Sequence, residues 1–322
     1  MNTLVTGGSG FIGAHLVSNI LKEGHEVRIY DKRRSATYPD LCIVADIRDK
    51  EKLAHSLRGI DAVYHLAAEH HDDVRPTSLY YEVNVGGAEN LVYALDKNRT
   101  NRLIFTSTTA LYRLNSGEPD EHSPVMPFND YGWSKYKSEM VFNEWAGDGE
   151  RRCLVTVRPT VIFGEGNRGN VYNLISQIRS GRFIMVGNGK NKKSMGYVLN
   201  LSQFLVELLE NKPGRHVYNY ADKPDLSVNE LVRIAVESRG KSGEINFRIP
   251  YIFGLMGGYA FDFLAKITGK TYPISSIRIK KFCADTRVSA EKLRESGFRA
   301  PYSLTDGLTR MIQSEYSQDS GY

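Results

Sequence analysis

Cysteine is scarce in this sequence, and the features that mark nucleic-acid binders are missing. Only three cysteines, Cys42, Cys153 and Cys283, occur in 322 residues. Their spacing fits no zinc-binding pattern and their number is odd, so buried free thiols in a reducing cytoplasm are the simplest interpretation. The chain has no block of basic residues interleaved with aromatic ones, and its net charge of +5 is mild. We therefore expect no nucleic-acid partner, whereas an anionic small substrate would suit this charge.

A long uninterrupted hydrophobic run is also missing. The most apolar stretch, residues 251–267, is broken by Asp262 and Lys266 and has small residues near its middle. It would make a poor membrane span, and we expect no segment that crosses a membrane. A packed helix is the favoured interpretation, with contact to a membrane or a partner as the alternative. The chain begins almost directly with a strand, so we expect no signal peptide and a cytoplasmic protein.

The most informative feature that is present is a glycine-rich turn near the N-terminus. It follows a short apolar run and precedes a stretch in which apolar residues recur at helical spacing. Strand, glycine turn and helix together present backbone N–H groups and the positive end of the helix dipole to a pyrophosphate. The pattern therefore predicts a dinucleotide-binding site. Its residues are Gly7, Gly10, Phe11, Ile12 and Gly13.

The ends of the next predicted strands extend this prediction. Asp31 ends the second strand, where a carboxylate can accept hydrogen bonds from the adenosine ribose, which favours NAD. The basic residues 32–34 leave NADP as the alternative, although solvated loop charges are their simpler interpretation. Residues 46–47 lie where an adenine would rest, and the small residues at 66–68 would let a cofactor approach. For His65 we expect a buried, hydrogen-bonded histidine rather than a catalytic one.

Hydroxyl groups and a Tyr/Lys pair form the candidate reactive cluster. Thr108 follows the strand at 102–106, and ligands of open α/β sheets bind beyond the carboxyl ends of the strands. Tyr131 and Lys135 open a predicted helix and share one face of it. A lysine ammonium beside a phenol lowers the phenol's pKa from about 10. Tyr131 could then act as a general base on a sugar hydroxyl that also hydrogen-bonds Thr108.

Together these motifs resemble the extended short-chain dehydrogenases/reductases, and within them the NAD-dependent epimerase/dehydratase group that acts on nucleotide sugars. The likeness runs from residue 2 to about residue 312 and is tighter in the N-terminal half. It implies Tyr131 as the catalytic base, Lys135 as its support and as a ligand of the nicotinamide ribose, and Thr108 as the hydroxyl partner. It also implies a homodimer built from the helices near residues 80–97 and 131–146. The residues expected to bind the cofactor are Gly7, Gly10, Phe11, Ile12, Gly13, Asp31, Asp46, Ile47, Leu66, Ala67, Ala68, Asn84, Thr106, Tyr131, Lys135 and Pro159.

Departures from the family pattern narrow the function. Family 4,6-dehydratases carry Asp-Glu after the catalytic threonine, and this chain has Thr109 and Ala110, which argues against a dehydratase. Lys193 lies where many members carry an Arg-Asp-Tyr-Ile-His-Val motif, and as a point charge it could still meet a phosphate. Adjacent histidines and acids at residues 69–73 are expected to line the sugar pocket and to bind no metal. The residues expected to touch the substrate are Glu69, His70, Thr108, Thr109, Asn170 and Lys193.

We predict an α/β fold, a doubly wound parallel sheet of Rossmann type with a smaller α/β C-terminal substrate lobe. Residues 1–163 would form the NAD(P)-binding domain, to which later segments return, 164–316 mainly the substrate lobe, and 317–322 a flexible tail. The predicted function is NAD-dependent 4-epimerisation of a nucleotide-linked hexose or N-acetylhexosamine, such as a UDP-sugar, through a transient 4-keto sugar in polysaccharide biosynthesis. The alternatives are an NAD(P)H-dependent reductase of a nucleotide-linked 4-keto-6-deoxy sugar and a non-enzymatic nucleotide sensor.

Overall fold

A parallel seven-stranded sheet forms the centre of the molecule. The computed structural model describes residues 1–322 except 72–73, 148–150, 239–247, 271, 273 and 317–322. The strand order is β3-β2-β1-β4-β5-β6-β10, and every neighbouring pair is parallel. This is the predicted doubly wound arrangement, whose order reverses between β1 and β4. The strands are β1 (Asn2–Thr6), β2 (Glu26–Asp31), β3 (Cys42–Val44), β4 (Ala62–His65), β5 (Arg102–Thr106), β6 (Cys153–Pro159) and β10 (Gly214–Tyr220).

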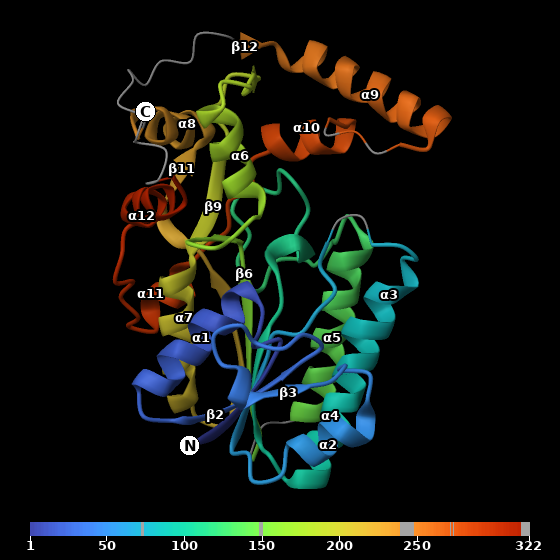
Figure 1. Cartoon of the computed structure of the whole chain (residues 1–322), viewed down its shortest axis with the longest axis vertical. Coiled ribbons are helices and arrows are strands. Elements are labelled where there is room, and N and C mark those ends of the chain that lie inside the picture. Colours follow the sequence, from blue (N-terminus) through green and yellow to red (C-terminus); the bar gives the residue numbers. More distant parts are fainter. Residues whose placement is uncertain (72–73, 148–150, 239–247, 271, 273, 317–322) are drawn as a thin grey trace.

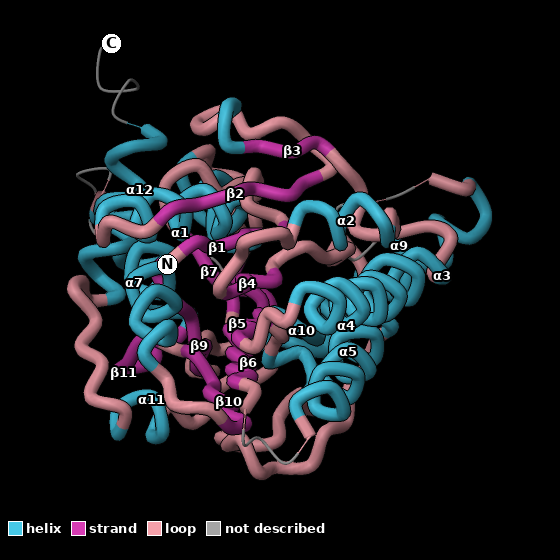
Figure 2. The backbone as a smooth tube through the Cα atoms, turned by 90° about the horizontal axis from the view of Figure 1, so that it is seen from below, coloured by secondary structure: helices cyan, strands magenta, loops and turns pink. Residues whose placement is uncertain are grey.

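Helices cover both faces of this sheet, so its strands are apolar on both sides (Figure 2). Along β1, Leu4 packs into the core on one face and Val5 into the core on the other. Helices α1 (Phe11–Lys22) and α7 (Val198–Glu207) cover the Val5 side. The Leu4 side is covered by α2 (Lys50–Ser56), α4 (Gly86–Asn98) and α5 (Asp130–Ala146).

The C-terminal lobe has its own small sheet and its own hydrophobic core. Its strands lie in the order β11-β9-β7 and are β7 (Val161–Phe163), β9 (Lys192–Tyr197) and β11 (Asp222–Ser227). Three amphipathic helices cover it: α6 (Asn170–Arg179), α8 (Val228–Glu237) and α12 (Leu304–Tyr316). Ser227 and Glu230 form a capping box at the start of α8, as their spacing in the sequence predicts. The remaining elements are η1 (Pro39–Leu41), α3 (Ser78–Tyr80), η2 (Tyr81–Val85), η3 (Thr109–Leu111), β8 (Met185–Val186), η4 (Leu208–Glu210), β12 (Arg248–Ile249) and α11 (Glu291–Glu295).

The chain passes between the two parts more than once. After β7, β9 and α6 it returns to the central sheet, where β10 pairs with β6, and it then leaves again for β11. The strand β7 lies in the small sheet, although the predicted division assigns residues 161–163 to the first domain. The segment predicted as a flexible tail, residues 317–322, lies outside the described residues.

The most apolar stretch of the sequence forms an exposed helix. It is α9 (Tyr251–Thr268), which lies beside α10 (Ser276–Cys283) at the top of Figure 1. Gly258 is the single buried residue of α9. The favoured interpretation, a packed helix, therefore holds only for the side of α9 that meets α10, because most other side chains of α9 are left exposed by the described chain. Among the described residues, no helix is both long and apolar enough to cross a membrane.

Candidate active site

The glycine turn lies between β1 and α1 and needs its glycines for close packing. Gly7 has a φ of +73°, and a Cβ atom there would lie 2.6 Å from the backbone nitrogen of Ala67. A Cβ atom on Gly13 would lie 2.3 Å from the carbonyl oxygen of Gly7. Gly10 begins α1 with no side chain capping the first N–H groups. Phe11 and Ile12 form the first helical turn, whose N–H groups can therefore meet an anion.

Asp31 lies at the end of β2 and holds the glycine turn. Its two carboxylate oxygens accept hydrogen bonds from the backbone nitrogens of Ser9 and Arg33, each at 3.0 Å. The side chain is buried. The neighbouring Lys32 pairs with Glu69 at 3.3 Å, so its charge is directed toward the loop that follows β4.

Asp46 and Ile47 do different things, although they are adjacent in the sequence. Asp46 accepts two hydrogen bonds from the guanidinium of Arg48, at 2.9 and 2.8 Å, and this contact lowers the pKa of its carboxyl group. Ile47 is buried, and its side chain would be only 3.0 Å from a Cβ atom on Gly87 of α4. Ile47 is therefore packed against α4, whereas Asp46 stays partly exposed beside it.

The segment after β4 brings a leucine and two alanines next to the glycine turn. Leu66, Ala67 and Ala68 are partly buried there. His65, just before them, is fully enclosed and lies 2.7 Å from the hydroxyl of Thr6. Burial lowers the pKa of His65 to about 3, so the imidazole stays neutral. The expectation of a buried, hydrogen-bonded histidine is confirmed.

The first turn of α5, which contains Tyr131, packs against η3, which follows β5 and Thr108. Asn129 caps α5 by accepting from the backbone nitrogen of Gly132 at 2.9 Å. A Cβ atom on Gly132 would lie 2.7 Å from the carbonyl oxygen of Ala110, so only glycine allows this approach. Thr108 is buried and caps η3 through its hydroxyl oxygen, which accepts from Ala110 at 3.1 Å. Its hydroxyl hydrogen remains available for a substrate oxygen.

Lys135 lies one helical turn after Tyr131 and is buried. Within the described part of the chain its ammonium meets no hydrogen-bond acceptor, and its nearest partner is the Phe105 ring, 4.2 Å from Nζ to the centroid. Burial lowers the pKa of Lys135 to about 7. The hydroxyl of Ser107, directly after β5, is buried and has no hydrogen-bond partner among the described residues. This hydroxyl and the Lys135 ammonium fit a ligand rich in hydroxyl groups, as the nicotinamide riboside of NAD is.

Asn84 connects the loop after β4 to α5. It belongs to η2, a π-helical turn, and it exchanges two hydrogen bonds with the backbone of Glu69, at 2.8 and 3.0 Å. Its amide also donates to Ser134 at 2.8 Å, and Ser134 donates to the carbonyl oxygen of Tyr131 at 2.8 Å. Sequence reasoning missed Ser134, because the contact joins residues fifty positions apart. This chain of hydrogen bonds fixes the first turn of α5.

A buried ion pair between α5 and β6 also holds this helix in place. The guanidinium of Arg158 on β6 binds the carboxylate of Glu139 on α5, at 3.0 and 2.7 Å. Tyr112 accepts a further hydrogen bond from Arg158 at 2.8 Å. Glu139 was not predicted. Its spacing from Lys135 is a single helical turn, which is the signal that could have found it.

Other predicted site residues lie around this cluster. Thr106 donates to the carbonyl oxygen of His65 at 3.1 Å, and Thr109 donates to that of Pro159 at 3.3 Å, so both hydroxyls link neighbouring strand ends. His70 stacks on His71 with ring centroids 4.5 Å apart. The acids at 72–73, which belong to the same predicted loop, lie outside the described residues. No group of three or more His, Cys, Asp or Glu side chains suited to an ion occurs in the described ranges.

Two predicted substrate residues come from the C-terminal lobe and are not brought to Tyr131 by any contact in the described residues. Asn170 is exposed at the start of α6. Lys193 donates to the carbonyl oxygens of Lys281 and Ala284, at 2.8 and 2.6 Å. Burial lowers the pKa of Lys193 to about 8. Its ammonium thus caps the C-terminal end of α10 rather than pointing freely into the site.

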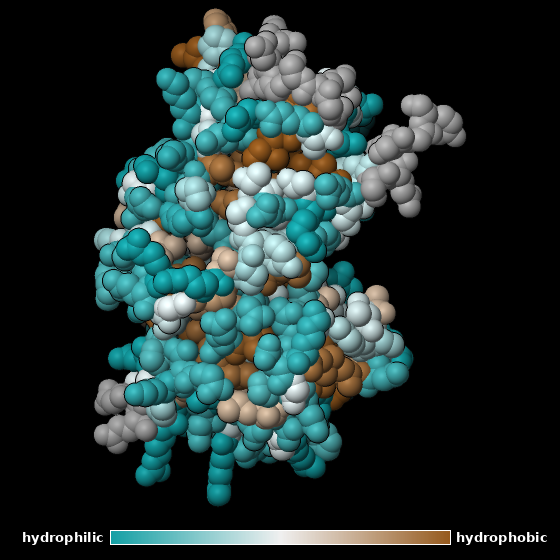
Figure 3. All heavy atoms as spheres, turned by 90° about the vertical axis from the view of Figure 1, so that its left-hand side faces the viewer, coloured by the Kyte–Doolittle hydropathy of each residue, from teal (hydrophilic) through white to brown (hydrophobic). Residues whose placement is uncertain are grey.

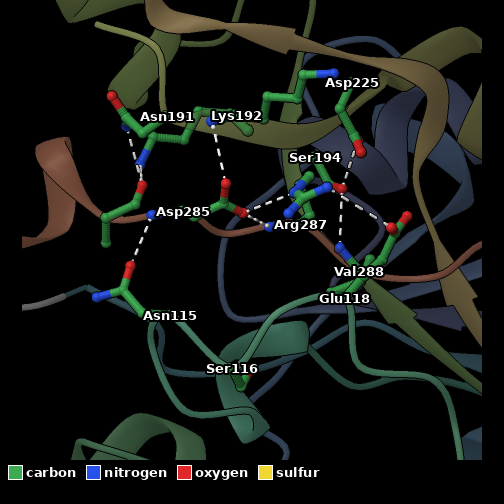
Figure 4. Close-up of polar contacts among 12 residues, drawn as sticks. Asn115, Ser116, Glu118, Asn191, Lys192, Ser194, Asp225, Asp285, Arg287 and Val288 are labelled. Carbon is green, nitrogen blue, oxygen red and sulfur yellow. Dashed lines mark hydrogen bonds and ion pairs between the residues drawn. The ribbon is translucent and has the colours of Figure 1, made fainter. Parts of the chain in front are cut away.

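A polar network ties the loop before α5 to the C-terminal lobe (Figure 4). The backbone nitrogen of Asp285 donates to the side chain of Asn115 at 2.9 Å, and Asn115 returns a backbone hydrogen bond at 3.3 Å. Arg287 binds Asp285 at 2.9 Å and approaches Glu118 at 3.9 Å. Asn191 donates to the carbonyl oxygens of Phe282 and Ala284 at the end of α10. The loop that leads to Tyr131 and the end of α10 are therefore held together.

Comparisons with known proteins match this arrangement. Residues 3–221 match the family described as NAD dependent epimerase/dehydratase. The chain is 49% identical over 317 residues, 98% of its own length and 95% of the relative's, to the N-acetyl-alpha-D-glucosaminyl-diphospho-ditrans,octacis-undecaprenol 4-epimerase of Escherichia coli O157:H7. It is 26% identical to the UDP-glucose 4-epimerase of Vibrio cholerae, over 97% of this chain and 94% of that one. The solved UDP-glucose 4-epimerase of Thermus thermophilus in complex with NAD shares the fold, with a TM-score of 0.75, 21% identity and 98% of each chain covered.

Proposed function

The chain belongs to the NAD-dependent epimerase/dehydratase family, and on that premise we propose that it inverts C4 of an N-acetylhexosamine linked through a diphosphate to a polyprenol. The predicted Rossmann-type fold, NAD as cofactor and NAD-dependent 4-epimerase activity are confirmed. The proposed substrate keeps the sugar and the diphosphate of the predicted nucleotide sugar and differs in the carrier. The observation that supports this carrier is 49% identity, along 98% of the chain, to an enzyme named for such a substrate.

Tyr131, Lys135 and Thr108 carry the proposed chemistry. Tyr131 takes the proton of the C4 hydroxyl and later returns it, and Thr108 hydrogen-bonds the same oxygen through both steps. Lys135 places a positive charge one helical turn away and favours the phenolate form of Tyr131. When bound, NAD would supply the hydride acceptor and donor for C4, and inversion requires the 4-keto ring to turn over between the two transfers. Asn84 and Ser134 keep Tyr131 in place through the hydrogen bonds described above.

We propose that the cofactor lies along the carboxyl edge of β1, β2, β4 and β5. The glycine turn and the first N–H groups of α1 would hold the pyrophosphate. Asp31 would accept from the adenosine ribose, residues 46–47 would flank the adenine, and residues 66–68 with Asn84 would border the middle of the dinucleotide. Lys135 and Ser107 would donate to the nicotinamide riboside, which satisfies two donors that have no partner among the described residues. Thr106 and Pro159 end the neighbouring strands at the nicotinamide side.

Location and assembly follow as further parts of this proposal. NAD is held in the cytoplasm, so the enzyme would work on the cytoplasmic side, in the assembly of a polysaccharide. A homodimer would form through α4 and α5, which pack side by side and leave Met140 of α5 54% exposed. Light scattering at micromolar concentration should give the mass of two chains, and a monomeric mass would contradict the dimer.

The experiment that tests the substrate compares two donors of the same sugar. Purified protein, whose bound NAD is first quantified after denaturation, is given either N-acetylglucosaminyl-diphospho-undecaprenol in detergent or UDP-N-acetylglucosamine. Formation of N-acetylgalactosamine is measured after hydrolysis, with Tyr131→Phe as the inactive control. We expect near-stoichiometric NAD and a higher kcat/KM for the lipid-linked sugar. Equal or better turnover of the UDP-sugar would overturn the proposed carrier and favour the predicted nucleotide sugar.

A further inference from the structure

Helix α9 carries a stripe of large apolar side chains that nothing in the described chain covers. The stripe residues are between half and two-thirds exposed, at 63, 63, 51, 65 and 66% in chain order. Their spacing of three or four residues places them on one side of the helix. By contrast, hydrophilic atoms predominate on the described part of the face in Figure 3, where hydrophobic ones occur in smaller groups. The stripe consists of Ile252, Met256, Tyr259, Phe263 and Ile267.

The opposite side of α9 fixes which residues point outward. A Cβ atom on Gly254 would lie 2.5 Å from the side chain of Val186, and one on Gly258 would lie 2.8 Å from the backbone of Ser276 in α10. Asp262 accepts from the backbone nitrogen of Ser276 at 3.2 Å. These three residues follow one another at intervals of four, so they lie on the side of α9 that packs against the described chain. The two glycines therefore face Val186 and α10, and the stripe faces away from them.

Basic residues border the stripe. Residues 251–281 contain five basic residues and one acidic residue, Asp262, whose carboxylate is already used by Ser276. Lys280 donates to the hydroxyl of Tyr259 at 2.9 Å, which holds an ammonium group at the edge of the stripe. Ile274 and Ile277, at the start of α10, continue the exposed apolar surface at 44 and 48% exposure. The five basic residues are Lys266, Lys270, Arg278, Lys280 and Lys281.

One contact joins this surface to the loop that precedes Tyr131. The ammonium of Lys281, at the end of α10, lies 5.2 Å from the ring centroid of Phe128. Phe128 in turn lines an open hollow of about 370 Å³, together with Met126 and Trp133. Phe128 and Trp133 lie three positions before and two after Tyr131, so the hollow adjoins the catalytic turn. The remaining lining residues are Arg113, Val125 and Pro127.

We propose that α9 and the start of α10 lie in the surface of an anionic lipid bilayer, with the apolar stripe among the acyl chains and the basic residues at the headgroups. An amphipathic helix with aromatic and aliphatic residues on one side and lysines at its border binds such a surface in the interface plane. This inference rests on the proposed function, because a polyprenol-linked sugar stays in the membrane. The hollow beside Phe128 would receive the first units of the lipid carrier as the sugar enters the site.

Vesicle flotation of the NAD-loaded full-length protein tests the docking surface. Vesicles of phosphatidylcholine with phosphatidylglycerol are compared with phosphatidylcholine alone, at low and high salt. We expect binding that needs the anionic lipid and weakens with salt. Phe263→Ser/Ile267→Ser should weaken it about tenfold or more, because two large apolar side chains no longer enter the acyl region. The matched control, Leu21→Ser/Val44→Ser, removes two exposed apolar residues far from α9 and should bind like the wild type. Equal binding by both double variants would overturn the proposal.

Two further measurements distinguish a helix that docks on a membrane from one that a second chain covers. If the stripe is covered by a second copy of the chain, Phe263→Ser/Ile267→Ser lowers the mass measured by light scattering, which overturns membrane docking. Activity is measured on a short-chain, water-soluble analogue of the lipid-linked sugar and on undecaprenol-linked sugar in vesicles. The α9 variant should keep turnover of the soluble analogue and lose turnover in vesicles. If vesicle binding requires α9 but only the UDP-sugar is converted, the proposed substrate fails and the docking surface stands.

Discussion

Two helices of nearly equal length, α5 with 17 residues and α9 with 18, distribute their side chains in opposite ways. Helix α5 buries four polar residues, Ser134, Lys135, Ser138 and Glu139, and leaves Trp133 and Met140 exposed. Helix α9 exposes most of its aromatic and aliphatic residues and buries only Gly258. The difference shows that hydropathy alone does not decide which side chains are enclosed. In α5 buried polar groups hold the first turn of the helix, which contains Tyr131, and in α9 apolar side chains stay uncovered by the described chain.

The largest expected effect on activity comes from removing the hydroxyl of Tyr131, in the first turn of α5. Tyr131→Phe should lower kcat by roughly 10²- to 10⁴-fold, the usual contribution of a positioned general base. Its bound NAD should stay near wild-type stoichiometry, because Lys135 and the glycine turn are unchanged. Tyr136→Phe, the same loss of a hydroxyl five residues further along α5, serves as the control in the same steady-state assay. Retention of more than about a tenth of wild-type kcat by Tyr131→Phe would refute a phenolate mechanism.

The buried ion pair below α5 gives the next largest effect. Glu139→Gln leaves the guanidinium of Arg158 enclosed without its carboxylate, and breaking such a pair lowers the free energy of unfolding by about 3–5 kcal/mol. The exposed pair between Glu51 and Lys97, at 3.0 Å, is the matched control, and Glu51→Gln should leave that free energy close to the wild-type value. Urea unfolding of the NAD-loaded protein measures both. Equal losses in the two variants would show that α5 is no more dependent on its buried charges than on its surface ones.

Local patterns predicted from the sequence correspond closely to the structure where one segment contains the whole signal. The glycine turn, the capping box at Ser227 and the Tyr131/Lys135 pair each lie within a few residues of chain, so spacing alone locates them. Contacts such as Asn84 with Ser134 join distant segments and leave no mark in spacing. The same limit applies to α9: three- and four-residue intervals give an apolar face, but the side that packs was determined by Gly254 and Gly258 meeting Val186 and Ser276.

Long-range packing also explains the other differences between sequence and structure. The apolar run at 183–186 is typical of a strand, but β8 covers only Met185–Val186, since only these two residues pair with β12. Lys193 was expected to meet a phosphate, and the sequence could not indicate that the end of α10, some ninety residues later, would present two carbonyl oxygens to it. The local sequence shows that a lysine is present, but it does not show which distant group that lysine will contact.

A smaller effect is expected at the far end of the cofactor. Asp31→Ala removes the acceptor proposed for the adenosine ribose and should weaken NAD binding by roughly 10- to 100-fold, the range for hydrogen bonds to a charged group. It should also narrow the preference for NAD over NADP, because a carboxylate no longer repels the 2′-phosphate. Asp40→Ala, an exposed acid of the same loop that lies 3.8 Å from Arg34, is the control. Fluorescence titration of cofactor-stripped protein measures both affinities, and an unchanged ratio would remove Asp31 from the ribose site.

The smallest expected effect is on the pH dependence of stability. It compares Lys135, which is buried, with the exposed lysines near α9. Its pKa is about 7 in the folded protein and about 10.4 in an unfolded chain, so between these values the unfolded state holds a proton that the folded state lacks. Stability should therefore rise with pH across this window, by at most about 1.4 kcal/mol per pH unit. Urea unfolding at pH 7, 8 and 9 is compared between the wild type and Lys135→Met. The difference between the two slopes of stability against pH gives the contribution of Lys135, since the other titrating groups are common to both proteins. Lys266→Met, an exposed change on α9, should leave the slope as in the wild type. If Lys135→Met keeps the wild-type slope of stability against pH, Lys135 does not cause that slope. Lys135 would then be as well solvated as the lysines near α9, and its ammonium would not depend on a bound cofactor for a partner.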